Sequence, residues 1–313
     1  MSRKTVTIPK LIASSVVRGS EQGESHGGLY TIDFTNQDIT QHIDWNTVDI
    51  DFTGRGWDRG LRGIEFYRRN IYIAASDELF IYDEQFSLLG SYKNPYLKHC
   101  HEICLRDNLL FITSTGYDSL LAFDMDSNTF VWGFYISSDE GDWLGQVFDP
   151  NSDKGPSFTN EYHINNVHIE KTGIYFSGLH THYLLHIDEK LLISKYTSLP
   201  AGAHNAMPFK NGVLFNDTQS NCVRYTDRNS NDKVFPVPVY NESQLEFMGV
   251  DDSKVARQGF GRGLCTFNEQ FIVAGSSPST ISVYDLVSGD RVTSVNLTMD
   301  IRNAIHGLEV WPE

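Results

Sequence analysis

The sequence predicts an all-β fold, a six-bladed β-propeller that forms one domain. The first observation is a phrase of apolar or β-favouring residues that ends in Asp and recurs six times, at Asp33, Asp83, Asp124, Asp188, Asp227 and Asp285. The separations are 50, 41, 64, 39 and 58 residues, so six units of about 50 residues account for the 313-residue chain. An aspartate at a strand end caps a tight turn through its side chain, which gives the repeat a local physical reason.

Two further observations agree with this fold class. Helical periodicity is absent throughout, and 12% of the residues are aromatic, a composition that favours strands. The last strand-like segment, 305–311, has no partner nearby in the sequence. Pairing it with the N-terminal segment closes the ring of blades, whereas a β-sandwich or a five-bladed ring leaves it unexplained.

The four-strand unit is clearest after His101, where we expect strands at 102–105, 109–114, 119–123 and 129–134. Equivalent units begin near Arg62, Asn165, His204 and Arg262, and the N-terminal segment supplies strands at 11–17, 28–32 and 39–43. The predicted blades cover residues 62–98, 99–137, 163–199, 203–240, 261–300, and 304–313 together with 8–45.

Long irregular connections join the last strand of one blade to the first strand of the next, at 46–61, 137–162 and 240–261. In a propeller such connections lie on one face, here called the upper face, beside the mouth of the central channel. The loops 20–28 and 180–182 belong to the same face. Long loops gathered on one rim indicate binding or catalysis.

Aligning the first strands of the six blades places one polar residue of each blade at a matching position: Arg62, His101, Asn165, His204, Arg262 and His306. The histidines are 103 and 102 residues apart and belong to alternate blades, about 120° apart around the axis. Three imidazoles with open positions are typical of a catalytic metal site. Imidazole selects transition metals, so we expect zinc, with iron or copper as alternatives. The other interpretation is a polar, solvent-filled channel that histidines merely line.

Other polar residues are expected near the same channel mouth. Arg62 and Arg262 are suited to hold a carboxylate or a developing negative charge, and Tyr162 is a candidate acid–base group. Six further residues are expected to orient the metal-binding histidines or to contact the substrate: His99, His163, Asn165, His180, His182 and Asp217.

Composition excludes several classes of function. A formal net charge of −15 argues against nucleic acid and against an anionic membrane surface as partners. No apolar run is long enough for a signal peptide or a membrane span, and the four cysteines show no metal-knuckle spacing, so we expect a reduced, cytoplasmic protein. Nucleophile-elbow, phosphate-loop and dinucleotide motifs are missing.

The ring of Arg62, His101, His204 and His306 resembles that of the six-bladed NHL-type propellers, in particular the catalytic core of peptidyl-α-hydroxyglycine amidating lyase. Ile305-His306-Gly-Leu matches the short histidine motifs of that family well, and the segments around His101 and His204 match more loosely. The resemblance implies zinc bound by one histidine from each of three alternate first strands. It also implies a catalytic arginine at Arg62 and a tyrosine near Tyr162. The alternative is an uncharacterised bacterial propeller family that uses similar ligands differently.

These observations favour a metal-dependent lyase or hydrolase that acts on a small anionic molecule. Iron or copper bound by the same three histidines would instead support oxygenase chemistry. A non-catalytic propeller that binds a ligand or a protein through its loop-rich face is the alternative from another class.

Overall fold

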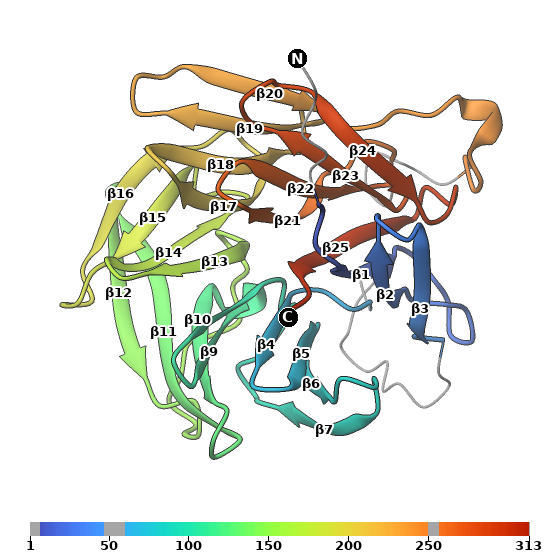
Figure 1. Cartoon of the computed structure of the whole chain (residues 1–313). Helices are drawn as coiled ribbons and strands as arrows, with labels where there is room; N and C mark the ends of the chain where they lie inside the picture. Colours follow the sequence, from blue (N-terminus) through green and yellow to red (C-terminus); the bar gives the residue numbers. More distant parts are fainter. Residues whose placement is uncertain (1–6, 47–59, 250–256, 313) are drawn as a thin grey trace.

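The computed structural model describes residues 7–46, 60–249 and 257–312, and it confirms the six-bladed β-propeller (Figure 1). The first blade contains β4 (Ile64–Tyr67), β5 (Asn70–Ala75), β6 (Glu78–Tyr82) and β7 (Leu88–Lys93). The second contains β8 (Ile103–Arg106), β9 (Leu109–Ser114), β10 (Ser119–Asp124), β11 (Thr129–Asp139) and β12 (Asp142–Phe148). The third contains β13 (Ile164–Glu170), β14 (Gly173–Gly178), β15 (Tyr183–Ile187) and β16 (Ile193–Ser198).

The other three are β17 (Ala203–Phe209), β18 (Gly212–Asp217), β19 (Cys222–Asp227) and β20 (Asp232–Pro236); β21 (Arg262–Phe267), β22 (Phe271–Ser276), β23 (Thr280–Asp285) and β24 (Arg291–Asn296); and β25 (Asn303–Val310), β1 (Leu11–Val17), β2 (Gly28–Asp33) and β3 (Asp38–Asp44). We number these blades one to six in the order given. Two short 3₁₀ helices lie between strands, η1 (Thr115–Tyr117) and η2 (Glu242–Gln244).

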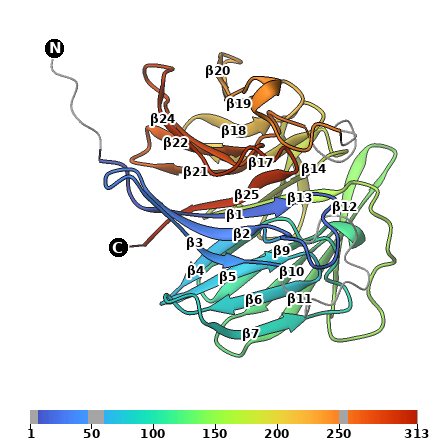
Figure 2. The same ribbon diagram turned by 90° about the vertical axis from the view of Figure 1, so that its right-hand side faces the viewer.

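The first strands of the six blades form a closed inner ring. β25 contacts β4, β4 contacts β8, and the series continues through β13, β17 and β21 back to β25. Seen from the side, the blades stack around this ring (Figure 2). The apolar core is divided in the same way, because six clusters of buried side chains each join two neighbouring blades. Each interface buries the apolar faces of two sheets, which drives the ring to close.

The recurring aspartates cap the turns as predicted. The carboxylate of each accepts hydrogen bonds from backbone N–H groups two to four residues further on, as Asp227 does from Asn229 and Asn231. The same contacts occur at Asp33, Asp83, Asp124, Asp188 and Asp285. Hydrogen bonds from Asn231 lower the pKa of Asp227. The sequence repeat is therefore a repeat of turn chemistry.

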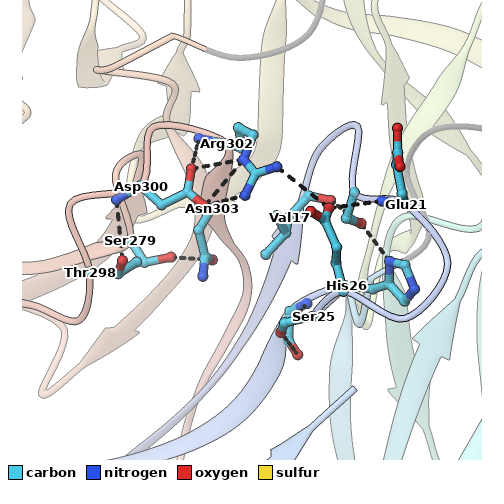
Figure 3. Close-up of polar contacts among 12 residues, drawn as sticks. Val17, Glu21, Ser25, His26, Ser279, Thr298, Asp300, Arg302 and Asn303 are labelled. Atoms are coloured by element: carbon cyan, nitrogen blue, oxygen red, sulfur yellow. Dashed lines mark hydrogen bonds and ion pairs between the residues drawn. The ribbon is translucent and has the colours of Figure 1, made fainter. Parts of the chain in front are cut away.

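The C-terminal strand closes the ring, as the sequence predicts. β25 pairs antiparallel with β1, with Leu11 opposite Val310 and Val17 opposite Asn303. Gly307 permits β25 to approach blade one closely, since a Cβ there would lie 2.1 Å from the carbonyl oxygen of Arg62. On the upper rim, Arg302 pairs with Asp300 at 3.0 Å and reaches the loop after β1 (Figure 3).

Blade two departs from its predicted bounds. The expected blade of residues 99–137 extends to Phe148, because β11 runs on to Asp139 and turns back as a fifth strand, β12. Part of the segment 137–162 is therefore a hairpin and not an irregular loop. The turn at Glu140 and Gly141 has positive φ at both residues, which suits a tight two-residue hairpin. The longer connections at 46–61 and 240–261 lie partly outside the described residues.

No helix in the described part of the chain has the length and apolar character needed to cross a bilayer. The four cysteines are free thiols, and three of them are buried.

Candidate functional site

The six aligned ring residues occupy equivalent positions in the structure. In blades one to five, the residue three positions after the ring residue pairs with the third residue of the second strand, as Met207 does with Leu214. The matching pairs are Glu65 with Tyr72, Cys104 with Phe111, His168 with Tyr175, and Cys265 with Val273. All six ring side chains are at most 6% exposed. The sequence alignment therefore holds residue by residue in these five blades.

The ladder between the first and second strands is interrupted at or next to the ring residue in four blades. Register shifts fall between Ile164 and Asn166 and between Arg262 and Leu264, as well as between His204 and Met207, and opposite His306 in β1. A bulge changes the direction of the side chains beside it, and such bulges are frequent next to functional sites.

His101 and His204 are held in the same way. The Nδ1 atom of His101 lies 2.7 Å from the carbonyl oxygen of His99 and 2.9 Å from Oγ1 of Thr115. The Nδ1 atom of His204 lies 2.9 Å from the carbonyl oxygen of Gly202 and 3.2 Å from Oγ1 of Thr218. In each case the carbonyl is two residues before the histidine and the threonine is 14 residues after it.

A carbonyl oxygen only accepts hydrogen bonds, so the contact with Gly202 places the proton of His204 on Nδ1, and its Nε2 keeps its lone pair. His101 has the same carbonyl contact at Nδ1, but Nη1 of Arg62, which only donates, also lies 3.2 Å from that atom. Burial lowers the pKa of both imidazoles well below the usual range, and Arg62 beside His101 and Arg262 beside His204 add to the effect. Both imidazoles are therefore neutral, which is the state that binds a metal ion.

Several buried polar atoms at the ring have no hydrogen-bond partner among the described residues. They are Nε2 of His204, Nδ1 of His306 and both amide atoms of Asn165. The residue before His204, Ala203, pairs with Asp217, and Thr218 follows Asp217 in β18. In blade six the residue before His306, Ile305, pairs with Ser15, so the position that corresponds to Thr218 is Val16 in β1. His306 consequently lacks the hydroxyl contact of the other two histidines. Buried polar atoms without partners are rare in folded proteins and indicate a place for a ligand.

The structure brings His101, His163 and His306 together. The ring centroids of His101 and His306 are 5.5 Å apart, and those of His101 and His163 are 5.3 Å apart. Burial lowers the pKa of His163 to about 4, with Arg62 and Arg262 as the next contributions. The imidazoles and guanidinium groups thus share one region of positive potential at the channel mouth.

The two ring arginines are buried among these histidines. Arg62 donates from Nη1 to the carbonyl oxygen of Cys100, and Arg262 donates from Nη1 to Oγ1 of Thr218 at 3.2 Å. Arg262 also lies over the ring of Phe260, as do Arg18 and Arg257. Positively charged groups therefore gather on this side of a protein whose net charge is −15.

Two expected residues lie elsewhere. The hydroxyl of Tyr162 accepts a hydrogen bond from the backbone N–H of Ser138 at 3.1 Å, and its ring packs on Trp143. Asp217 pairs with Arg224 at 2.9 Å and has no described contact with His204. Thr218 and the Gly202 carbonyl hold His204 instead. The common spacing of 14 residues from His101 to Thr115 and from His204 to Thr218 is the sequence signal for these partners.

The remaining histidines lie around the mouth to different degrees. His99 supplies the carbonyl that holds His101, and its ring faces Phe158 with centroids 6.2 Å apart. His180 is exposed and near enough to His163 to lower its pKa. His182 is also exposed, with a positive φ of 55°, and its carbonyl oxygen accepts from the backbone of Leu199.

The donor chemistry of the ring fits a transition-metal ion. Two neutral imidazoles anchored at Nδ1, and buried ring nitrogens without partners, are what such an ion would complete. Two imidazoles on one tetrahedral ion have centroids about 5 Å apart, slightly less than the 5.5 Å between His101 and His306. Within residues 7–46, 60–249 and 257–312, no group of three His, Cys, Asp or Glu side chains is placed so that it could hold a metal ion.

Comparison with known proteins establishes the fold and no activity. No protein family and no curated protein matches the sequence, so the resemblance to the amidating lyase has no support from sequence comparison. A protein of unknown function from Bacteroides caccae is similar in structure, with a TM-score of 0.58, 11% identity, and coverage of 96% of this chain and 98% of that one. A chain from a nidogen–laminin complex has a TM-score of 0.56 at 8% identity, covering 96% and 97%.

A virginiamycin B lyase from Staphylococcus aureus, solved with quinupristin, has a TM-score of 0.49 at 12% identity, covering 82% of this chain and 72% of that one. At these identities the likeness concerns the fold alone.

Proposed function

We propose that the chain is a metal-dependent enzyme, a lyase or hydrolase, in which His101, His204 and His306 hold a divalent ion. Zinc is the expected ion, with iron or copper as alternatives that would imply oxidative chemistry. The observation that supports this is the matched anchoring of His101 and His204 by a carbonyl and a threonine hydroxyl. Such outer contacts orient metal-bound histidines.

The substrate of this enzyme is a small anionic molecule. Arg62 and Arg262 lie buried within the ring, and their charges lower the pKa of His306 after the larger effect of burial. A guanidinium group can bind a carboxylate through two parallel hydrogen bonds. Asn165 offers one further donor and one acceptor, both without described partners, to the same molecule.

A bound divalent ion lowers the pKa of a coordinated water or hydroxyl group. The residues of the chain provide the rest. The arginines hold the anion and offset negative charge that develops during the reaction. The buried walls of the channel limit the access of water to the reacting groups, which strengthens these electrostatic interactions.

Elemental analysis of protein purified without a histidine tag tests the proposal. We expect about one transition-metal ion per chain, or its uptake on reconstitution, and loss of uptake in each of His101→Ala, His204→Ala and His306→Ala. His42→Ala is the matched control, because His42 contacts Thr31 of its own blade six and Phe86 of blade one, outside the ring. Circular dichroism and thermal melting of the metal-free proteins separate loss of binding from loss of fold.

Metal content far below one ion per chain, with no uptake on reconstitution, would refute the enzyme. A non-catalytic binding propeller would then be favoured, particularly if His204→Ala leaves the protein unchanged. The identity of the retained ion also decides between the two chemistries, since zinc supports lyase or hydrolase steps, whereas iron or copper supports oxygen chemistry.

A further inference from the structure

A second polar cavity lies further along the inner strands, beyond the histidine ring. It has a volume of about 270 Å³ and is called the chamber below. Its walls are Glu65, Glu102, Ile103, Cys104, Asn166, Val167, His168, Asn205, Met207, Leu264, Cys265, Thr266 and Glu309. Neither lysine nor arginine is among these residues.

The negative groups of the chamber lie on one side. Glu309 belongs to blade six, Glu65 to blade one and Glu102 to blade two, which are consecutive in the ring. Glu65 accepts from the backbone N–H of Leu105, and Glu102 accepts from Asn205. None of the three glutamates forms an ion pair within the described part of the chain.

The opposite side of the chamber is apolar or neutral. Met207 of blade four, Leu264 of blade five and Val167 of blade three form this wall. The chamber is therefore amphipathic, with carboxylates facing hydrocarbon across the channel axis.

The side-chain oxygen of Asn166 provides an observation that is independent of the glutamates. Asn166 is 4% exposed and faces the chamber, and its Nδ2 donates to the carbonyl oxygen of Ala206 at 2.5 Å. Its Oδ1 accepts no hydrogen bond from any described residue. An amide oxygen and ionised carboxylates only accept hydrogen bonds, so a group that binds to all of them must be a donor.

We propose that the chamber binds a small alkylammonium ion, with the charged head group among the three glutamates and the carbon chain against the wall formed by blades three to five. An ammonium group offers three N–H donors, which suits several acceptors arranged around it. The carbon chain accounts for the apolar wall, which an inorganic ion would leave without a partner.

The size of the chamber favours the same class of ligand. A water molecule occupies about 30 Å³ in the liquid. The chamber volume of about 270 Å³ is therefore larger than a single inorganic ion needs and leaves room for a short carbon chain. Burial raises the pKa of Glu65 to about 7 and that of Glu309 well above its usual range, so a bound cation would favour the ionised forms of both.

Calorimetric titration of the full chain with n-butylammonium chloride tests the proposal, in amine-free borate buffer at pH 8.5. We expect saturable binding of one ion per chain. Glu65→Gln and Glu309→Gln should each weaken it at least tenfold, because each removes a charge-assisted hydrogen bond. The exposed Glu189→Gln should leave the affinity unchanged, and neutral n-butanol should not bind.

A variant that supplies its own ammonium group guards against misfolded glutamine variants. Met207→Lys places an amine in the chamber wall, so it should fold and no longer bind butylammonium. Absence of saturable heat, or equal affinity in all variants, would overturn the proposal. So would calcium or magnesium binding that depends on Glu65 while butylammonium fails to bind. The metal content of the histidine ring is measured in the same samples and decides the other proposal separately.

Discussion

Asp118 fixes the segment that carries Tyr162 and His163, and its replacement by asparagine gives a quantitative test of the upper face. The carboxylate is fully buried and accepts four hydrogen bonds. Oδ1 accepts from the backbone N–H groups of Tyr162 and His163 at 3.0 and 2.9 Å, and Oδ2 accepts from Glu161 and from the hydroxyl of Thr159 at 2.6 and 2.9 Å. One residue of blade two thus orders the loop that enters blade three.

Asp118→Asn keeps one acceptor oxygen and replaces the other with an NH₂ group. That group is itself a donor, so it cannot accept from the two donors that face it. Two of the four hydrogen bonds are lost, and each bond to a charged group contributes about 1.5–3 kcal/mol. The freed N–H groups belong to a half-exposed loop and can bind water, so we expect the lower end of the range. The free energy of unfolding should fall by about 3 kcal/mol.

Urea denaturation measures the loss of stability, and hydrogen exchange of a peptide covering 157–165 measures the loosening of the loop. Exchange at Glu161, Tyr162 and His163 should accelerate before global unfolding. Asp149→Asn is the control, because Asp149 accepts from Asn151 in an exposed turn and should cost well under 1 kcal/mol. A loss below about 0.5 kcal/mol in Asp118→Asn, with unchanged exchange, would refute the reasoning.

Two further predictions concern the ring and the chamber. Thr218→Val removes the hydroxyl that contacts His204 and Arg262. Zinc affinity, measured by competition with a chelating dye, should fall about 10- to 100-fold while the fold is retained. Unchanged affinity would contradict the anchoring role. Burial raises the pKa of Glu65 to about 7, so the native state favours the protonated form, and the stability it contributes is present below pH 4.5 and lost as pH rises through 7. The unfolding free energy of the native protein should therefore decline between pH 4.5 and 8, and in amine-free buffer Glu65→Gln should remove about 2 kcal/mol of this decline. If the pH dependence of the unfolding free energy is the same in both proteins, Glu65 ionises normally.

Much of the fold follows from the sequence because its signals are local and repeated. An aspartate that caps its own hairpin turn needs only residues two to four positions away, so the six caps are visible in the chain. The even spacing of His101, His204 and His306 then sets the register of the ring. The fifth strand of blade two is not predicted because its turn is of another kind: Asp139 ends β11, but no described backbone N–H donates to its carboxylate.

The candidate site was predicted only in part. The alignment placed the ring residues at matching positions because the first and second strands of each blade are joined by a short hairpin, which sets their pairing. The alignment could not give Tyr162 its contact with Ser138 or Asp217 its contact with Arg224, because both depend on where neighbouring strands end. The hydroxyls of Thr115 and Thr218 carry a regular spacing, but their role appears only when the second strand lies beside the first.

A closed ring of six blades follows from the sequence alone, because turn chemistry and strand patterning act within one blade and recur along the chain. The contents of the channel depend on how the blades pack. Glu65, Glu102 and Glu309 lie far apart in the chain and meet because closure of the ring by β25 makes blades six, one and two neighbours. Their raised pKa values and the unpartnered atoms of Asn165 and His204 are consequences of burial, which exists only once the blades have packed.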